Sequence, residues 1–402
     1  MPALQDPPVR HSRLLIWLAI FLIGLNLRPI MAAIGPVLDT LKLNVGLTDV
    51  GAGFLTTLPV FAMGLVALFG GVLQRWISPW KGVGLAVLVI ALASLVRGFG
   101  HSNEWLILTA AVGGVGIAVV QALMPAYIKN RLGERAGQGM ALFTTGIMAG
   151  SAVAAGTAAP FAEWLGWPFA LSVWSALGLI AAVVWRRSTR HLAPSPAPQR
   201  FALPVRSRRA WFLLLFFGIG TSAYTLVLAW LPPFYTQLGH SPAFSGLLLG
   251  VLTLIEVGAG LSLSVVLPRF PDRRQLLFTV LALGVAGFLA LIVAPNALVW
   301  PAIVALGLSI GTMFPLALIV TMEHLDDERA AGALMGFVQG GGYILASLMP
   351  LVAGMIRQET ADLTNAWLIM LVGTGVQMAM VPFILPGDRL VPGSWRLARA
   401  GA

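Results

Sequence analysis

Twelve long runs of apolar residues, separated by short polar connections, dominate the chain. No alternation of apolar and polar residues is sustained in them, so the pattern indicates helices that are hydrophobic on all sides. Each run is long enough to cross about 30 Å of hydrocarbon as a helix. The expected spans lie at about 14–38, 48–73, 81–99, 104–128, 136–160, 165–186, 209–235, 243–267, 275–294, 297–322, 329–356 and 364–385.

Composition strengthens this interpretation. Hydrophobic residues make up 58% of the chain and charged residues only 10%, whereas a soluble protein carries about 25% charged residues. The runs are too long and continuous for the strands of a membrane β-barrel. We therefore expect an all-α polytopic membrane protein.

The chain divides into two halves of six spans. Domains are expected at 1–13 (a polar N-terminal tail), 14–186 (a first six-helix bundle), 187–208 (a linker rich in Pro and Arg), 209–386 (a second bundle) and 387–402 (a C-terminal tail). Similar residues recur at an offset of 194 positions, as in Gly64 and Gly258, or Glu134-Arg135-Ala136 and Glu328-Arg329-Ala330. Six spans per half give both halves the same orientation, which predicts bundles related by a pseudo-two-fold axis along the membrane normal.

Basic residues lie almost entirely on one predicted side of the membrane. Of the 25 Lys and Arg residues, 21 fall in the two tails, the central linker and the connections on the same side. The opposite side holds Lys42, Arg97 and Arg357. The one remaining basic residue, Arg28, lies within a span. Because cytoplasmic loops retain Lys and Arg, both termini are expected in the cytoplasm of a bacterium, with the spans in its inner membrane. The net charge of +10 then reflects topology and contact with lipid rather than nucleic-acid binding.

Arg28 is the only basic side chain near the middle of a span. A charge at that depth costs at least about 3 kcal/mol, so its expected role is functional. Pro29 follows it and interrupts the helix by removing a backbone N–H donor. Two interpretations stay open: Arg28 binds an anionic or electronegative solute through its planar set of donors, or it forms a fixed bridge to a neighbouring helix.

Glu256 is the only acidic residue near mid-span. Its counterpart at the repeat offset is Ala62, so this acid does not belong to the repeated framework. It is a candidate for proton coupling, and the alternative is a structural acid paired with Arg28 or with nearby hydroxyls.

Other polar residues within the spans could join a shared solute site. The candidates are Asn26, Gln121, Tyr224, Gln339 and Tyr343, although Asn26 points away from Arg28 in a regular helix. Helix-to-helix hydrogen bonding is the alternative for each. Residues expected to serve conformational change are Pro29 at the break and the loop arginines Arg75, Arg135, Arg269 and Arg329.

The twelve spans, the six-plus-six division and the central linker resemble the major facilitator superfamily. Its loop signature between helices 2 and 3 is similar to Gly70-Gly71-Val72-Leu73-Gln74-Arg75, although Gln74 replaces the acidic residue. Within that superfamily, Gly24-Leu25-Asn26-Leu27-Arg28-Pro29 and Met124-Pro125-Ala126-Tyr127 resemble the cyanate porter group. The resemblance implies a central cavity lined by helices 1, 4, 7 and 10, and solutes such as cyanate-like anions, carboxylates or nitro-heterocycles.

A secondary transporter of a small anionic or electronegative solute, working by alternating access, is therefore the leading functional prediction. A second prediction is that transport is coupled to protons, by symport or by antiport. The alternative is efflux of amphipathic drugs, with Arg28 purely structural. An enzyme is disfavoured because no nucleophile–base pair or P-loop lies in the spans. The chain has no cysteine and its five histidines are scattered, so neither a metal nor another cofactor is expected, and the chain is expected to be a monomer.

Overall fold

The computed structural model describes residues 9–189, 203–325, 327–391 and 397–398, and these residues are almost entirely helical. The α-helices are α1 (Val9–Asn26), α2 (Pro29–Ala32), α3 (Leu38–Val45), α4 (Asp49–Trp76), α5 (Pro79–Arg97), α6 (Asn103–Leu132), α7 (Ala136–Leu165), α8 (Trp167–Ser172), α9 (Trp174–Thr189), α10 (Arg208–Gln237), α11 (Pro242–Val266), α12 (Arg273–Val293), α13 (Val299–Met322), α14 (Glu328–Thr360) and α15 (Thr364–Met380). The 3-10 turns are η1 (Gly35–Val37), η2 (Gly133–Arg135), η3 (Leu267–Arg269) and η4 (Val381–Phe383), and β1 (Arg389–Leu390) pairs antiparallel with β2 (Leu397–Ala398).

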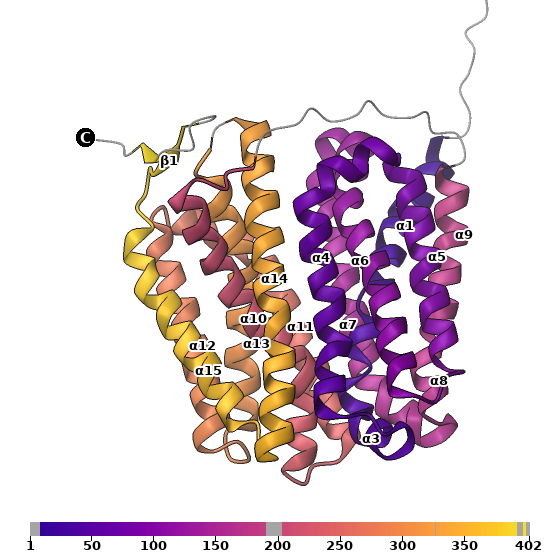
Figure 1. Cartoon of the computed structure of the whole chain (residues 1–402). Coiled ribbons are helices and arrows are strands. Elements are labelled where there is room, and N and C mark those ends of the chain that lie inside the picture. Colours follow the sequence, from indigo (N-terminus) through magenta and orange to yellow (C-terminus); the bar gives the residue numbers. More distant parts are fainter. Residues whose placement is uncertain (1–8, 190–202, 326, 392–396, 399–402) are drawn as a thin grey trace, which may run out of the picture.

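The predicted all-helical fold of two bundles is confirmed. Within the described residues, eleven helical stretches are long and apolar enough to cross a membrane. One of these, Asn103–Leu165, contains both α6 and α7, which meet at η2, so the chain makes twelve crossings. The helices of the first half and those of the second form two bundles that stand side by side, with α4 and α14 between them (Figure 1).

Small residues let the two bundles approach closely. A side-chain carbon added at Gly64 of α4 would lie 2.7 Å from the carbonyl oxygen of Gly340 in α14, and one added at Gly53 would lie 2.7 Å from that of Pro350. Helices in a membrane associate through such close packing, because lipid tails are as apolar as their side chains. The α4–α14 contact therefore joins the bundles along much of its length.

The first predicted span differs from the expectation of one helix over 14–38. It consists of α1, a bend at Leu27 and Arg28, then α2, η1 and α3. Pro29 removes the N–H that would bond to the Leu25 carbonyl, and Pro36 repeats the effect in η1. The close approach of α7 holds the chain before the bend, since a carbon added at Gly146 would lie 2.6 Å from the Phe21 carbonyl oxygen.

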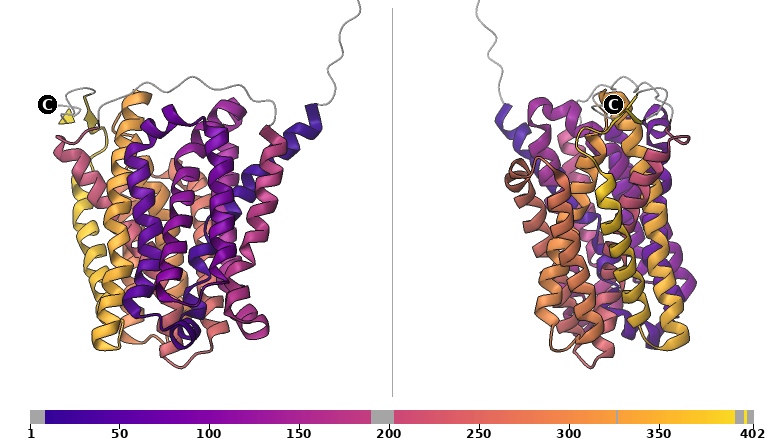
Figure 2. Two further views of the ribbon diagram at one scale, coloured as in Figure 1. Left: turned by 45° about the vertical axis from the view of Figure 1, so that its right-hand side comes forward. Right: turned by 90° about the vertical axis from the view of Figure 1, so that its left-hand side faces the viewer.

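The start of α1, the end of α9, the start of α10 and β1 all lie at the same end of the molecule (Figures 1 and 2). At that end, Arg209 of α10 pairs with Asp388 at 2.9 Å, and its Nε donates to His324 Nε2 at 3.0 Å. Burial holds the pKa of His324 below its usual value, which favours the neutral ring that accepts this bond. The backbone N–H of Leu390 donates to the His324 carbonyl at 2.7 Å. These contacts fix the residues after α15 onto the second bundle.

Candidate functional site

The break in the first span places Arg28 inside the protein. Arg28 precedes α2 with φ −101° and ψ −24°, and Pro29 starts that short helix. The side chain of Arg28 is only 6% exposed. Broken backbone at membrane depth is tolerated where it is buried in protein or lines a cavity. The local sequence thus directs a charged side chain inward.

The guanidinium of Arg28 has weak partners. Its Nη1 lies 3.9 Å from the sulfur of Met31 and 3.8 Å from the sulfur of Met63 in α4. Its Cζ lies 5.5 Å from the ring centroid of Tyr224 in α10, in a cation–π contact. The Nε atom has no hydrogen-bond partner, and no carboxylate forms an ion pair with Arg28 among the described residues. Its positive charge is therefore buried without an ion-pair partner among the described residues.

Glu256 is the second charged group at this depth. It lies in α11, is 4% exposed, and neither of its carboxylate oxygens has a hydrogen-bond partner within the described part of the chain. It interacts electrostatically with Arg28, but the two do not reach the 4.0 Å distance of an ion pair. A direct bridge between these residues is thus absent from this conformation of the described chain.

Tyr224 connects the two charged groups. Besides its ring contact with Arg28, its hydroxyl interacts electrostatically with both Arg28 and Glu256. The hydroxyl also faces Ser151 of α7, although neither group reaches hydrogen-bond geometry. Tyr343 of α14 interacts with Arg28 and Tyr224. The structure therefore brings four of the predicted residues, from both bundles, into one buried cluster.

The other predicted solute contacts make no hydrogen bond or ring contact with Arg28 or Glu256 among the described residues. Gln121 of α6 is partly buried and its Oε1 has no partner in the described structure. Gln339 is partly buried one turn before Tyr343 on α14. Asn26 is 2% exposed and faces α9, where a carbon added at Gly178 would lie 3.1 Å from its amide. Asn26 is thus on another side of the first helix from Arg28.

The predicted conformational arginines lie at helix ends. Arg135 in η2 and Arg269 in η3 are exposed, and neither makes an ion pair with any described side chain. The side chains of Arg75 and Arg329 lie outside the described residues. Pro29 occupies the break itself.

Arg97 is a buried residue of this region that the sequence interpretation did not select. It ends α5, is 1% exposed, and its Nη1 donates to the Ile30 carbonyl at 2.7 Å. Its Nε donates to the Thr109 hydroxyl at 3.1 Å. Ile30 lies two residues after Arg28, so Arg97 holds the segment that follows the break. The available signal was that Arg97 is one of three basic residues on the side poor in Lys and Arg.

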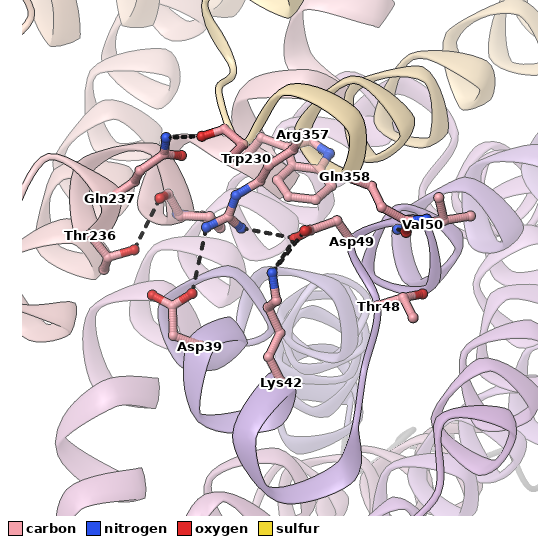
Figure 3. Close-up of polar contacts among 12 residues, drawn as sticks. Asp39, Lys42, Thr48, Asp49, Val50, Trp230, Thr236, Gln237, Arg357 and Gln358 are labelled. Carbon is pink, nitrogen blue, oxygen red and sulfur yellow. Dashed lines mark hydrogen bonds and ion pairs between the residues drawn. The ribbon is translucent and has the colours of Figure 1, made fainter.

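The other two basic residues of that side form an ion network between the bundles (Figure 3). Arg357 of α14 lies 3.2 Å from Asp49 of α4 and 3.6 Å from Asp39 of α3. Lys42 pairs with Asp49 at 2.8 Å. Because Arg357 belongs to the second bundle and its acidic partners to the first, the network joins the bundles at the end opposite to β1.

Aromatic and backbone contacts support this network. The guanidinium of Arg357 lies 5.6 Å from the ring of Trp230, whose Nε1 donates to the Pro350 carbonyl at 2.9 Å. Deeper along α4, the Thr57 hydroxyl donates to the Ser347 carbonyl of α14 at 2.7 Å. The contacts between the bundles thus continue from the network towards the interior.

Known proteins resemble this chain in sequence and in fold. A family model described as Major Facilitator Superfamily matches residues 16–350. The chain is 36% identical over 361 residues to the "Cyanate transport protein CynX" of Escherichia coli (strain K12), covering 87% of this chain and 92% of that protein. It is 27% identical over 373 residues to the "2-nitroimidazole transporter" of the same organism, covering 91% and 93%. The crystal structure of a D-xylose-proton symporter has the same fold, with a TM-score of 0.75, 12% identity, and coverage of 93% of this chain and 97% of that one.

The ion network predicts how access to the end opposite β1 is controlled. Thr57 is 6% exposed beneath the network. In a Thr57→Cys protein, Arg357→Gln removes the cation between Asp39 and Asp49, and we expect maleimide labelling of the cysteine to accelerate at least about tenfold, which corresponds to ~1.4 kcal/mol. Because the natural chain has no cysteine, the introduced thiol is the only target.

The matched control is Glu359→Gln, which removes a charge from the same helix end at an exposed residue. It should leave the labelling rate unchanged. Equal labelling rates with and without Arg357→Gln would show that the network does not hold this end closed.

Proposed function

The chain belongs to the Major Facilitator Superfamily, and on that premise we propose that it moves a small anionic or electronegative solute by alternating access, with Arg28 as the main solute contact. The observation that carries the proposal is a buried guanidinium that forms no ion pair with any residue that the structure describes. An unpaired buried charge is strongly unfavourable, whereas a bound acceptor that accepts its hydrogen bonds compensates it.

The local chemistry supports a compact solute. Methionine sulfurs are weak hydrogen-bond acceptors, so Met31 and Met63 leave the guanidinium free to exchange them for an oxygen or nitrogen acceptor. The ring of Tyr224 supplies a flat wall, and Tyr343, Gln121 and Gln339 are proposed as the polar parts of the surrounding wall. Two relatives, a cyanate transport protein and a 2-nitroimidazole transporter, support this solute class by their names.

The arrangement of the bundles supports alternating access. The network around Arg357 joins the bundles at one end. Breaking it would expose the Arg28 region from that side, and restoring it would close that side again. The bias of Lys and Arg supports an orientation in a bacterial inner membrane with β1 and the α9–α10 connection on the cytoplasmic side. Pro29 and the loop arginines Arg75, Arg135, Arg269 and Arg329 are proposed to take part in the movement.

Arg28 is tested by substitution. Arg28→Lys keeps the charge but loses the planar set of donors. Since a hydrogen bond to a charged group is worth about 1.5–3 kcal/mol, we expect both Arg28→Lys and Arg28→Ala to reduce solute affinity by roughly ten- to a hundredfold. The measurement is uptake of labelled cyanate and of a labelled nitroimidazole into proteoliposomes. Arg186→Lys, at an exposed residue of α9, is the control and should transport normally.

If both Arg28 variants retained normal uptake and binding of each probe, Arg28 would not be the solute contact. Export of amphipathic compounds with a structural Arg28 would then be the better description.

Proton coupling is proposed at Glu256, because it is a buried acid beside the solute contact and interacts with both Arg28 and Tyr224. In Glu256→Gln the side chain keeps its size but cannot release a proton. We expect uptake driven by a pH gradient to be lost while solute exchange without a gradient continues. Glu163→Gln, an exposed acid on α7, should behave as the unmodified protein. Unchanged gradient-driven uptake in Glu256→Gln would remove Glu256 from the coupling.

A further inference from the structure

The buried cluster has two poles with opposite hydrogen-bonding character. Arg28 offers only N–H donors, and its Nε has no partner within the described structure. Ionised Glu256 offers only acceptors, and both of its oxygens are buried without a partner among the described residues. The two side chains come from different bundles and do not neutralise each other in an ion pair.

Unsatisfied buried polar groups are rare in native proteins, and each one calls for an explanation. Here donors and acceptors are left unsatisfied in the same cluster, although a direct Arg28–Glu256 bridge would satisfy both. Because Arg28 and Glu256 are not paired, Arg28 can bind one end of a solute and Glu256 can bind the other. A solute that filled only the Arg28 end would leave the carboxylate of Glu256 buried without a hydrogen bond, which is unfavourable.

Tyr224 lies where the body of such a solute would rest. Its ring faces the Arg28 guanidinium with 5.5 Å between Cζ and the centroid, and its hydroxyl interacts with both charged groups. Aromatic rings favour flat partners in offset-stacked arrangements. The hydroxyl itself has no partner in the described structure, so it can donate to or accept from the same solute.

The charges of Arg28 and Glu256 also favour a solute with two chemically different ends. The cluster contains the permanent positive charge of Arg28 and the acid Glu256, which is negative only after it has released its proton. With Glu256 ionised, a simple anion at Arg28 would lie near a like charge, which is unfavourable in a medium of low dielectric, so a simple anion is favoured when Glu256 is protonated. A neutral molecule with an electronegative end and a donor end meets both groups favourably.

We infer, on the basis of the proposed function, that the solute site recognises a small flat molecule by both ends: an acceptor group at Arg28 and an N–H donor at Glu256, with Tyr224 against its face. A nitroazole with a free ring N–H is a member of this class. Glu256 is then a specificity-determining residue that selects for the donor.

The test uses a matched pair of probes, 4-nitroimidazole and 1-methyl-4-nitroimidazole, which differ in the ring N–H. Their dissociation constants are measured by calorimetry on the purified full chain without a pH gradient. The unmodified protein should bind the N–H compound at least about tenfold more tightly, as expected for a hydrogen bond to a charged group. Arg28→Ala should weaken binding of both compounds.

Variants at Glu256 separate hydrogen bonding from steric fit. Glu256→Leu keeps a side chain of similar volume but removes the acceptor, and it should abolish the preference for the N–H compound. Glu256→Gln keeps one carbonyl acceptor and should retain part of the preference. This variant provides the test if the leucine variant unfolds. The control is Thr253→Val, because the Thr253 hydroxyl bonds to the Leu249 carbonyl of its own helix at 2.9 Å. It should keep the full preference.

Equal affinities for the two compounds, both dependent on Arg28, would overturn the inference and leave Arg28 as a solute contact. A preference that persisted in Glu256→Leu would also overturn it, because the preference would then be steric. Binding of both compounds that did not depend on Arg28 would instead contradict the proposed function.

Discussion

The break after α1 is the constraint on which the rest of the site depends. In a continuous helix the backbone would not bend at Arg28. The guanidinium would then face lipid or form a bridge to a neighbouring helix. Pro29 interrupts the helix, and Gly146 lets α7 pack directly on the backbone before the bend. Arg97 then binds the Ile30 carbonyl after it. Arg97 thus holds the segment that presents Arg28, and the Nε of Arg28 keeps no hydrogen-bond partner within the described part of the chain.

The two halves share a framework but not this chemistry. The residue that corresponds to Arg28 in the second half, at the offset of 194, is Ser222. Ser222 lies within the uninterrupted helix α10, and its hydroxyl bonds to the Gly218 carbonyl one turn earlier. Conversely, Ala62 occupies the position of Glu256 in the first half. The repeat therefore explains how the bundles are built, whereas each half contributes a different charge to the cluster between them.

The sequence was sufficient for the fold and for the two central charges, because long apolar runs and a charge within such a run are visible without knowledge of packing. It also indicated Tyr224 and Tyr343, which the structure places in the cluster with Arg28. It did not identify Arg97 or the Asp39–Asp49–Arg357 network, because those contacts join helices far apart in the chain. It indicated an interruption at Pro29, but it did not show that the first span continues as the separate pieces α2, η1 and α3, since a proline can also bend a helix without ending it.

We propose that the solute, and not Glu256, supplies the acceptor for Arg28. The most direct test is a crystal structure with selenocyanate, whose selenium locates a cyanate-like anion by anomalous scattering. We predict the anion within about 4 Å of the Arg28 guanidinium, in contact with Tyr224 and with Glu256 unpaired from Arg28. An anion bound elsewhere, together with an ion pair between Arg28 and Glu256, would contradict it.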